Sequence, residues 1–135
     1  GFLSTSVVTI GEHLQRAGYD TFMTGKWHLG LSQLPSARGF DRTFVLVDGA
    51  ASHYDMSGYS EARPVARFMR DGEATELPAG FYSSDGYTDA LIEMIGDERS
   101  RPFLAYLSFT APHWPLHAPA ENIARYAGVY EAGWD

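Results

Sequence analysis

Cysteine is absent from this sequence of 135 residues. Its absence excludes disulfide bridges, thiolate metal sites and a cysteine nucleophile within these residues. It leaves the cellular compartment open, because both exported and cytosolic proteins can lack cysteine.

Long apolar runs and basic runs are also missing. The uninterrupted apolar stretches are a few residues long, well short of the ~20 that a membrane-spanning helix needs, so we expect no membrane span. Lys and Arg total 10 against 17 Asp and Glu, which gives a net charge of −7. Binding of a polyanion normally needs a basic face, which argues against nucleic acid as a partner. Net charge does not exclude a local pocket where two or three cations meet one small anion.

The overall composition is typical of a globular protein with a packed core, since 44% of the residues are hydrophobic and 20% are charged. The length is about that of one domain. The chain begins at Gly1 without an initiator methionine or a signal-peptide pattern, and it ends at Asp135 without a polar tail. We therefore expect an interior segment of a longer protein.

A helix followed by a strand is predicted near the start of the chain. Thr9 and Glu12 have the spacing of a capping box, apolar residues follow at helical spacing, and Gly18 suits the C-terminal end of a helix. Residues 19–24 are rich in aromatic and β-branched side chains, which predicts a strand. That strand leads directly into a polar loop at residues 25–30.

The later segments continue an α/β pattern. The stretch 31–62 is predicted to be loop, interrupted by a strand at 43–47, and Asp71-Gly72 between apolar flanks predicts a hairpin with a type I′ turn. Three further elements are predicted: a helix at 84–95, a strand buried on both faces of a parallel sheet at 103–107, and a short helix at 121–126.

Two polar loops, each just after a predicted strand, carry the candidate catalytic residues. Lys26 and His28 lie in the first loop, and an extended backbone there would point both side chains to the same side. His113 lies in the second loop between Pro112 and Pro115, which restrict its backbone. Ligands of open α/β sheets bind at the carboxyl ends of strands, and a fixed cation beside imidazoles suits an anionic oxygen and proton transfer. The residues alone indicate an anion-handling site of unspecified reaction, and ordinary surface positions are the alternative.

Other polar residues are interpreted as structural. His13 is expected on the solvated side of the first helix, and His117 is expected to be exposed rather than to support the site. The segment His53-Tyr54-Asp55 could contact a metal or substrate, but an ordinary polar loop is the favoured interpretation. Capping and solvation account for Asp85 and Asp89.

Several segments together resemble one enzyme family in the order of their motifs. The matching segments are residues 17–21, 24–30, 38–41, 81–85, 109–116 and 130–135. The most specific are Gly25-Lys26-Trp27-His28-Leu29-Gly30 and Ala111-Pro112-His113-Trp114-Pro115. On these segments the chain resembles the type I, formylglycine-dependent sulfatases, and in particular the bacterial arylsulfatases.

The resemblance implies an alkaline-phosphatase-like α/β fold, with a mixed sheet flanked by helices, and hydrolysis of a small-molecule sulfate ester. In this family a Cys or Ser is oxidised to formylglycine, whose hydrate attacks sulfur, and a calcium ion held by Asp and Asn polarises the sulfate. By motif, Lys26 would contact the sulfate and the formylglycine. His28 would hydrogen-bond the formylglycine and act as a base, and His113 would bind sulfate and protonate the departing alcohol oxygen.

The sequence departs from the family pattern in what it does not contain. The nucleophile motif Cys/Ser-x-Pro-x-Arg is missing, because Ser32, Pro35 and Arg38 have a different spacing and follow Lys26 instead of preceding it. The family's Asp-Asp and later Asp-Asn metal pairs are missing too. We therefore expect residues 1–135 to be an interior segment of a single sulfatase catalytic domain, truncated at both ends. Its nucleophile and calcium ligands would lie in the remainder of the chain, so the segment alone is predicted to be inactive.

Two alternatives stay open at this point. One is a phosphonate or phosphodiester hydrolase of the same superfamily. The other is a catalytically inactive homologue that acts as a binding or structural protein. The residues do not indicate which sulfate ester would be the substrate, whether the protein is exported, or its oligomeric state.

Overall fold

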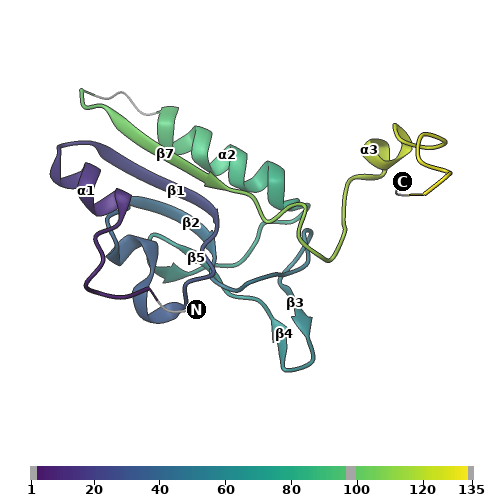
Figure 1. The fold of residues 1–135 in the computed structure, drawn as a ribbon, viewed down its shortest axis with the longest axis horizontal. Helices are drawn as coiled ribbons and strands as arrows, with labels where there is room; N and C mark the ends of the chain where they lie inside the picture. The colour runs from purple at the N-terminus through teal and green to yellow at the C-terminus, as the bar shows by residue number, and fades with distance from the viewer. Residues whose placement is uncertain (1–2, 97–99, 134–135) are drawn as a thin grey trace.

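The computed structural model describes residues 3–96 and 100–133, which form a mixed α/β sheet with helices on its faces (Figure 1). In the described part, five strands lie in the order β6-β5-β2-β1-β7. Their bounds are β1 (Asp20–Lys26), β2 (Arg42–Leu46), β5 (Phe68–Arg70), β6 (Glu73–Ala74) and β7 (Phe103–Ser108). The helices are α1 (Ile10–Arg16), α2 (Ser83–Gly96) and α3 (Ala120–Ala124). None of these helices has the length and apolarity needed to cross a bilayer.

The capping box predicted for the first helix is present. The backbone N–H of Glu12 donates to Oγ1 of Thr9 at 3.0 Å, and the N–H of Thr9 donates to Oε2 of Glu12 at 2.7 Å. Gly18 follows the helix with a φ of +87°, the left-handed conformation expected of a terminal glycine. Local sequence therefore defines both ends of α1.

The three parallel strands β2, β1 and β7 end at the same edge of the sheet. Gly25 is aligned with Val45 of β2 on one side and with Ser108 of β7 on the other. A Cβ atom at Gly25 would lie 1.9 Å from the carbonyl oxygen of Ser108, so only glycine allows this close approach. The loops that follow β1, β2 and β7 are thereby brought together.

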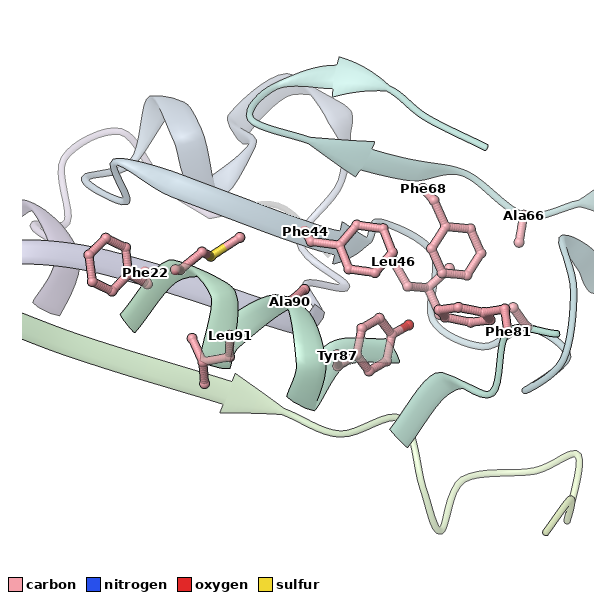
Figure 2. Packing of buried hydrophobic residues seen from close by; sticks show 11 residues of the cluster. Phe22, Phe44, Leu46, Ala66, Phe68, Phe81, Tyr87, Ala90 and Leu91 are labelled. Atoms are coloured by element: carbon pink, nitrogen blue, oxygen red, sulfur yellow. The ribbon is translucent and has the colours of Figure 1, made fainter. Parts of the chain in front are cut away.

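The sheet buries different residues on its two faces. Phe22, Phe44 and Leu46 pack toward α2 (Figure 2). Met23 and Val45 belong to the opposite cluster. It lies on the side of α1, of the 3-10 turns η1 (Leu31–Gln33) and η2 (Pro35–Ala37), and of their loops (Figure 1). Successive residues of β1 and β2 thus face opposite layers, as strand geometry requires.

Aromatic packing dominates the layer between the sheet and α2. The ring of Phe44 meets Phe81 edge-on with centroids 6.2 Å apart, and it lies 5.8 Å from the ring of Tyr87. Each large apolar side chain buried in this way contributes about 1.5–3 kcal/mol relative to exposure. This layer fixes the N-terminal end of α2 near the ends of the strands.

Two hairpins complete the described chain, and sequence analysis found one of them. Asp71 and Gly72 connect β5 and β6 with φ values of 50° and 92°, as the predicted type I′ turn requires. The second hairpin, β3 (Ser57–Ser60) with β4 (Arg63–Val65), lies within the stretch that was predicted to be loop. Its strands are short and largely exposed, so they lack the alternation of apolar and polar residues by which strands are recognised.

The prediction that strand 103–107 is buried on both faces is wrong. β7 pairs with β1 in parallel, as expected, but it is the edge strand of the described sheet. The side chains of Phe103 and Tyr106 are 44% and 47% exposed. An apolar run indicates that a strand can be buried on both faces. Whether it is buried depends on helices or strands from elsewhere in the chain that pack against it.

Candidate functional site

Lys26 and His28 lie at the carboxyl end of β1, where the strand leaves the sheet. Both line a pocket of about 200 Å³ together with Met23, Tyr106 and Ser108. The backbone is not extended through His28, which has a φ of 62°. The two side chains nevertheless reach the same pocket.

Trp27 anchors the turn between these two residues. Its backbone N–H donates to the carbonyl oxygen of Leu46 at 2.8 Å, and its indole Nε1–H donates to the carbonyl oxygen of Gln33 at 2.9 Å. The indole is buried in the cluster that contains Met23 and Val45. This anchoring explains why the chain turns sharply at His28 instead of continuing as a strand.

The electrostatics of the pocket favour a neutral imidazole beside an ammonium group. Partial desolvation lowers the pKa of His28, and the positive charges of Lys26 and His113 lower it further. Desolvation also lowers the pKa of Lys26. A histidine whose pKa is below its usual value of about 6.5 is mostly neutral at pH 7 and can accept a proton.

His113 lies in the loop after β7, and its imidazole is fixed at one nitrogen. Its Nδ1–H donates to the carbonyl oxygen of Trp114 at 2.6 Å, and its backbone N–H donates to the carbonyl oxygen of Thr110 at 2.9 Å. The side chain lines a pocket of about 330 Å³ with His53 and Tyr82, not the pocket of Lys26 and His28. The structure therefore does not place all three side chains in one pocket.

His53 is a buried residue, contrary to the prediction of an ordinary polar loop. Its side chain is 1% exposed, and its Nδ1 lies 2.6 Å from the hydroxyl oxygen of Ser83 at the start of α2. Its Nε2 lies 3.4 Å from the carbonyl oxygen of His113, and its backbone N–H donates to Nδ1 of His117 at 3.4 Å. Because a carbonyl only accepts, Nε2 of His53 is the donor in its contact with His113, and in the corresponding neutral tautomer Nδ1 accepts from the hydroxyl of Ser83.

A group of three charged residues near His28 was not recognised from the sequence. Asp48 follows β2, is 5% exposed, and accepts hydrogen bonds from the guanidinium groups of Arg63 and Arg67. Burial opposes ionisation of Asp48, but the bonds from the two arginines outweigh it and the pKa of Asp48 falls. His28 and these three residues line a pocket of about 410 Å³. In the sequence near Asp48, the only sign of this group is an aspartate directly after an apolar strand. Its two arginine partners come from β4 and from the segment after it, so sequence spacing does not connect them to Asp48.

The remaining sequence candidates are accounted for by local structure. His13, Asp85 and Asp89 are exposed on their helices, as expected. His117 is also exposed, although its ring packs against Tyr54 and His53. Arg38 is buried, with its Nε 3.0 Å from Oε1 of Glu12, so it serves the packing of α1.

Metal binding finds no support among residues 3–96 and 100–133, because they contain no group of three or more His, Asp or Glu side chains that could hold an ion. The Asp48 carboxylate is already occupied by two guanidinium groups. The residues described do not fit a calcium site.

Comparison with known proteins places these features in context. The family model described as Sulfatase matches residues 2–135. An uncharacterised sulfatase of Schizosaccharomyces pombe is 40% identical over 145 residues, covering all of this chain and 26% of the relative. An arylsulfatase of Klebsiella aerogenes is 41% identical over 138 residues, covering 98% of this chain and 30% of the relative. The chain thus spans less than a third of the length of either protein.

Solved structures share the fold at lower sequence identity. Ps i-CgsB, also solved in complex with a neocarrahexaose, matches with a TM-score of 0.80 at 23% identity, over 93% of this chain and 31% of that chain. A structure solved with its substrate D-glucosamine-2-N,6-O-disulfate matches with a TM-score of 0.72 at 24% identity, over 96% of this chain and 24% of that one. The predicted α/β fold of the alkaline-phosphatase type is confirmed by these matches.

Proposed function

Because this chain belongs to the sulfatase family, we propose that the complete protein hydrolyses sulfate esters, with Lys26, His28 and His113 in its active site. The observation that carries the proposal is the shared pocket of Lys26 and His28 at the carboxyl end of β1. A cation and a neutral base side by side, in a cavity large enough for a tetrahedral anion, suit the binding and cleavage of a sulfate ester. An arylsulfatase-like activity is the specific form that we propose.

Lys26 is proposed to bind the sulfate oxygens. It is the last residue of β1, so its backbone is held by the sheet while its side chain enters the pocket. The ammonium group is partly desolvated, and an ion pair is stronger where water is excluded. Lys26 would therefore stabilise negative charge that develops on the sulfate.

His28 is proposed to act as a proton acceptor. Its pKa lies below the usual value for histidine, first through desolvation and then through the charges of Lys26 and His113. A neutral imidazole at pH 7 is ready to accept a proton without prior deprotonation. His28 lies beside Lys26 in the pocket, so it can act on a group bound to the same sulfate.

His113 is proposed to protonate the departing alcohol oxygen. The hydrogen bond from its Nδ1–H to the carbonyl oxygen of Trp114 orients the ring. Nε2 is then the nitrogen that can deliver a proton to the substrate. Because His113 lines a different pocket, the leaving group would lie between that pocket and the sulfate.

Formylglycine and calcium are general to the sulfatase family, but the described residues fit neither. The sequence has no cysteine and none of its serines lies in a Ser-x-Pro-x-Arg motif, and the described residues have no metal-binding cluster. We propose that both groups belong to the remainder of the complete protein, and that residues 1–135 are an interior segment of its single catalytic domain. The small-molecule sulfate ester would then be bound jointly by this segment and that remainder.

Substitution of the three residues in the complete protein tests the proposal. Lys26→Ala, His28→Ala and His113→Ala should each lower kcat for an aryl sulfate by about 100-fold or more, while the melting temperature stays near that of the wild type. His13→Ala, an exposed histidine on α1, is the matched control and should keep wild-type kcat. Wild-type rates in all three variants would refute the assignment, and faster turnover of an aryl phosphonate than of the matching sulfate would favour the phosphonate hydrolase instead.

A further inference from the structure

Two arginines of the β3–β4 hairpin region converge on one buried carboxylate. Arg67 reaches Asp48 with two nitrogens, its Nε lying 3.2 Å from Oδ2 while its Nη2 donates to Oδ1. The backbone N–H of Arg67 donates to the same Oδ2 at 2.8 Å, and Nη1 of Arg63 donates to Oδ1. Asp48 thereby holds both guanidinium groups in fixed positions at the wall of a pocket.

The charge of this cluster is not balanced. Two guanidinium groups face one carboxylate, which leaves an excess of one positive charge. Within the described residues, Nε and Nη2 of Arg63 and Nη1 of Arg67 have no hydrogen-bond acceptor. The two arginine side chains are 44% and 39% exposed, whereas the Asp48 side chain is 3% exposed. The free donors are therefore on the accessible side of the cluster, in a protein whose net charge is −7.

The pocket beside the arginines adjoins the pocket of the proposed reaction. Its volume is about 410 Å³, within the usual range for small-molecule sites. His28 lines both this pocket and the one that contains Lys26. A ligand with its sulfate ester at Lys26 can thus extend past His28 toward Arg63 and Arg67. Tyr59 of β3 also lines the larger pocket and offers an aromatic face to a ring.

We propose that the pocket of Arg63 and Arg67 is a substrate subsite for a second anionic group, a sulfate or a carboxylate on the same molecule as the scissile ester. Guanidinium groups held in place by a buried carboxylate bind such planar or tetrahedral oxyanions with several directed hydrogen bonds. The preferred substrates would then be sulfate esters that carry a further negative charge. The inference rests on the proposed function for the position of the ester, but the subsite itself can be measured by binding alone.

Binding of stable sulfonates by the complete protein tests the subsite without turnover. Isothermal titration calorimetry would compare benzenesulfonate, which has one charge, with 3-sulfobenzoate and benzene-1,3-disulfonate, which have two. We expect at least one of the dianions to bind about ten-fold more tightly than the monoanion, the gain typical of a charge-assisted contact. The dianion that shows the gain identifies carboxylate or sulfate as the preferred second group.

Substitutions then assign that gain to the arginines. Arg63→Gln should bring the ratio of the monoanion and dianion dissociation constants close to one, and Arg63→Lys should keep most of the preference because it keeps the charge. Arg63 is chosen because its loss leaves Asp48 bonded to Arg67. The matched control is Arg70→Gln, an arginine of similar exposure that pairs with Glu93 outside both pockets, and it should leave the ratio unchanged.

The outcomes separate the two proposals. Equal affinity for all three sulfonates in the wild type, or an unchanged ratio in Arg63→Gln, overturns the subsite even if aryl sulfates are hydrolysed. A dianion preference that Arg63→Gln abolishes, in a protein that hydrolyses no aryl sulfate, upholds the subsite and overturns the proposed function.

Discussion

The position of His28 depends on the residue that lies opposite its ring. Gly49 follows Asp48 beyond the end of β2, and a Cβ atom at Gly49 would lie 2.7 Å from Nε2 and 3.1 Å from Cε1 of His28. Its backbone does not have a positive φ, so glycine is needed there for space and not for conformation. The absence of a side chain at Gly49 thus leaves room for the imidazole of His28.

Gly49→Ala is therefore expected to impair activity without unfolding the protein. The added methyl group would displace the imidazole, and a displacement of about 1 Å at a reacting group can reduce the rate by up to about 100-fold. We expect kcat for an aryl sulfate to fall by at least about ten-fold, measured in the complete protein. The control is Gly96→Ala at the end of α2, where a Cβ atom meets nothing within 4 Å. Equal rates in the two variants would show that the ring of His28 is not held against Gly49.

At the scale of elements, His53 joins three segments that are distant in sequence. Its ring contacts Ser83 at the start of α2 and the carbonyl oxygen of His113 in the loop after β7. Its own carbonyl oxygen accepts from the backbone N–H of Ser83 at 2.8 Å. The buried histidine therefore positions the loop that carries His113 relative to the helix.

Ser83→Ala should weaken this connection. The substitution leaves Nδ1 of His53 buried without its hydroxyl partner, at a cost of about 1–3 kcal/mol. We expect a lower melting temperature and a lower kcat in the complete protein, because the loop of His113 loses part of its support. Ser84→Ala, one position along the same helix, serves as the control. If both variants melt at the same temperature, the contact between Ser83 and His53 does not stabilise the protein.

The elements differ in how far local sequence determined them. The ends of α1 and the turn between β5 and β6 follow from a capping box and from two residues with positive φ, and both were predicted. The hairpin of β3 and β4 was missed, because its exposed strands carry no periodic pattern. Elements with a local chemical signature are thus predictable, whereas strands formed by pairing alone are not.

At the scale of the molecule, one side of the sheet and the region beyond it expose apolar surface. β7 forms the edge of the described sheet, and α3 stands away from it at the end of an extended stretch (Figure 1). Several large apolar side chains in this region are exposed: Phe103, Tyr106, Trp114, Leu116 and Ile123. Exposed strand edges and apolar patches of this kind promote association with other chains.

The isolated segment of residues 1–135 is therefore expected to self-associate and to lack sulfatase activity. Association would follow from the exposed edge and apolar surface. Inactivity would follow because the sequence lacks the Cys/Ser-x-Pro-x-Arg nucleophile motif and the residues that the structure describes contain no metal-binding cluster. Light scattering coupled to size-exclusion chromatography would measure the first property, and an aryl sulfate assay the second. Turnover by a monomeric segment would contradict both expectations.

The sequence by itself determined the α/β class, most element positions, the sulfatase family and the loops that hold Lys26, His28 and His113. These features depend on residue spacing, periodicity and short motifs. Each of these signals is contained in a short stretch of the sequence and can be recognised without knowing the fold. Tertiary structure alone decided the left-handed turn at His28, the burial of His53 and the convergence of Arg63 and Arg67 on Asp48. The last two depend on partners 15 to 64 positions apart in the chain, and no local pattern encodes which distant side chains will meet. For the same reason, the apolar sequence of β7 could not reveal that the strand lies at an exposed edge.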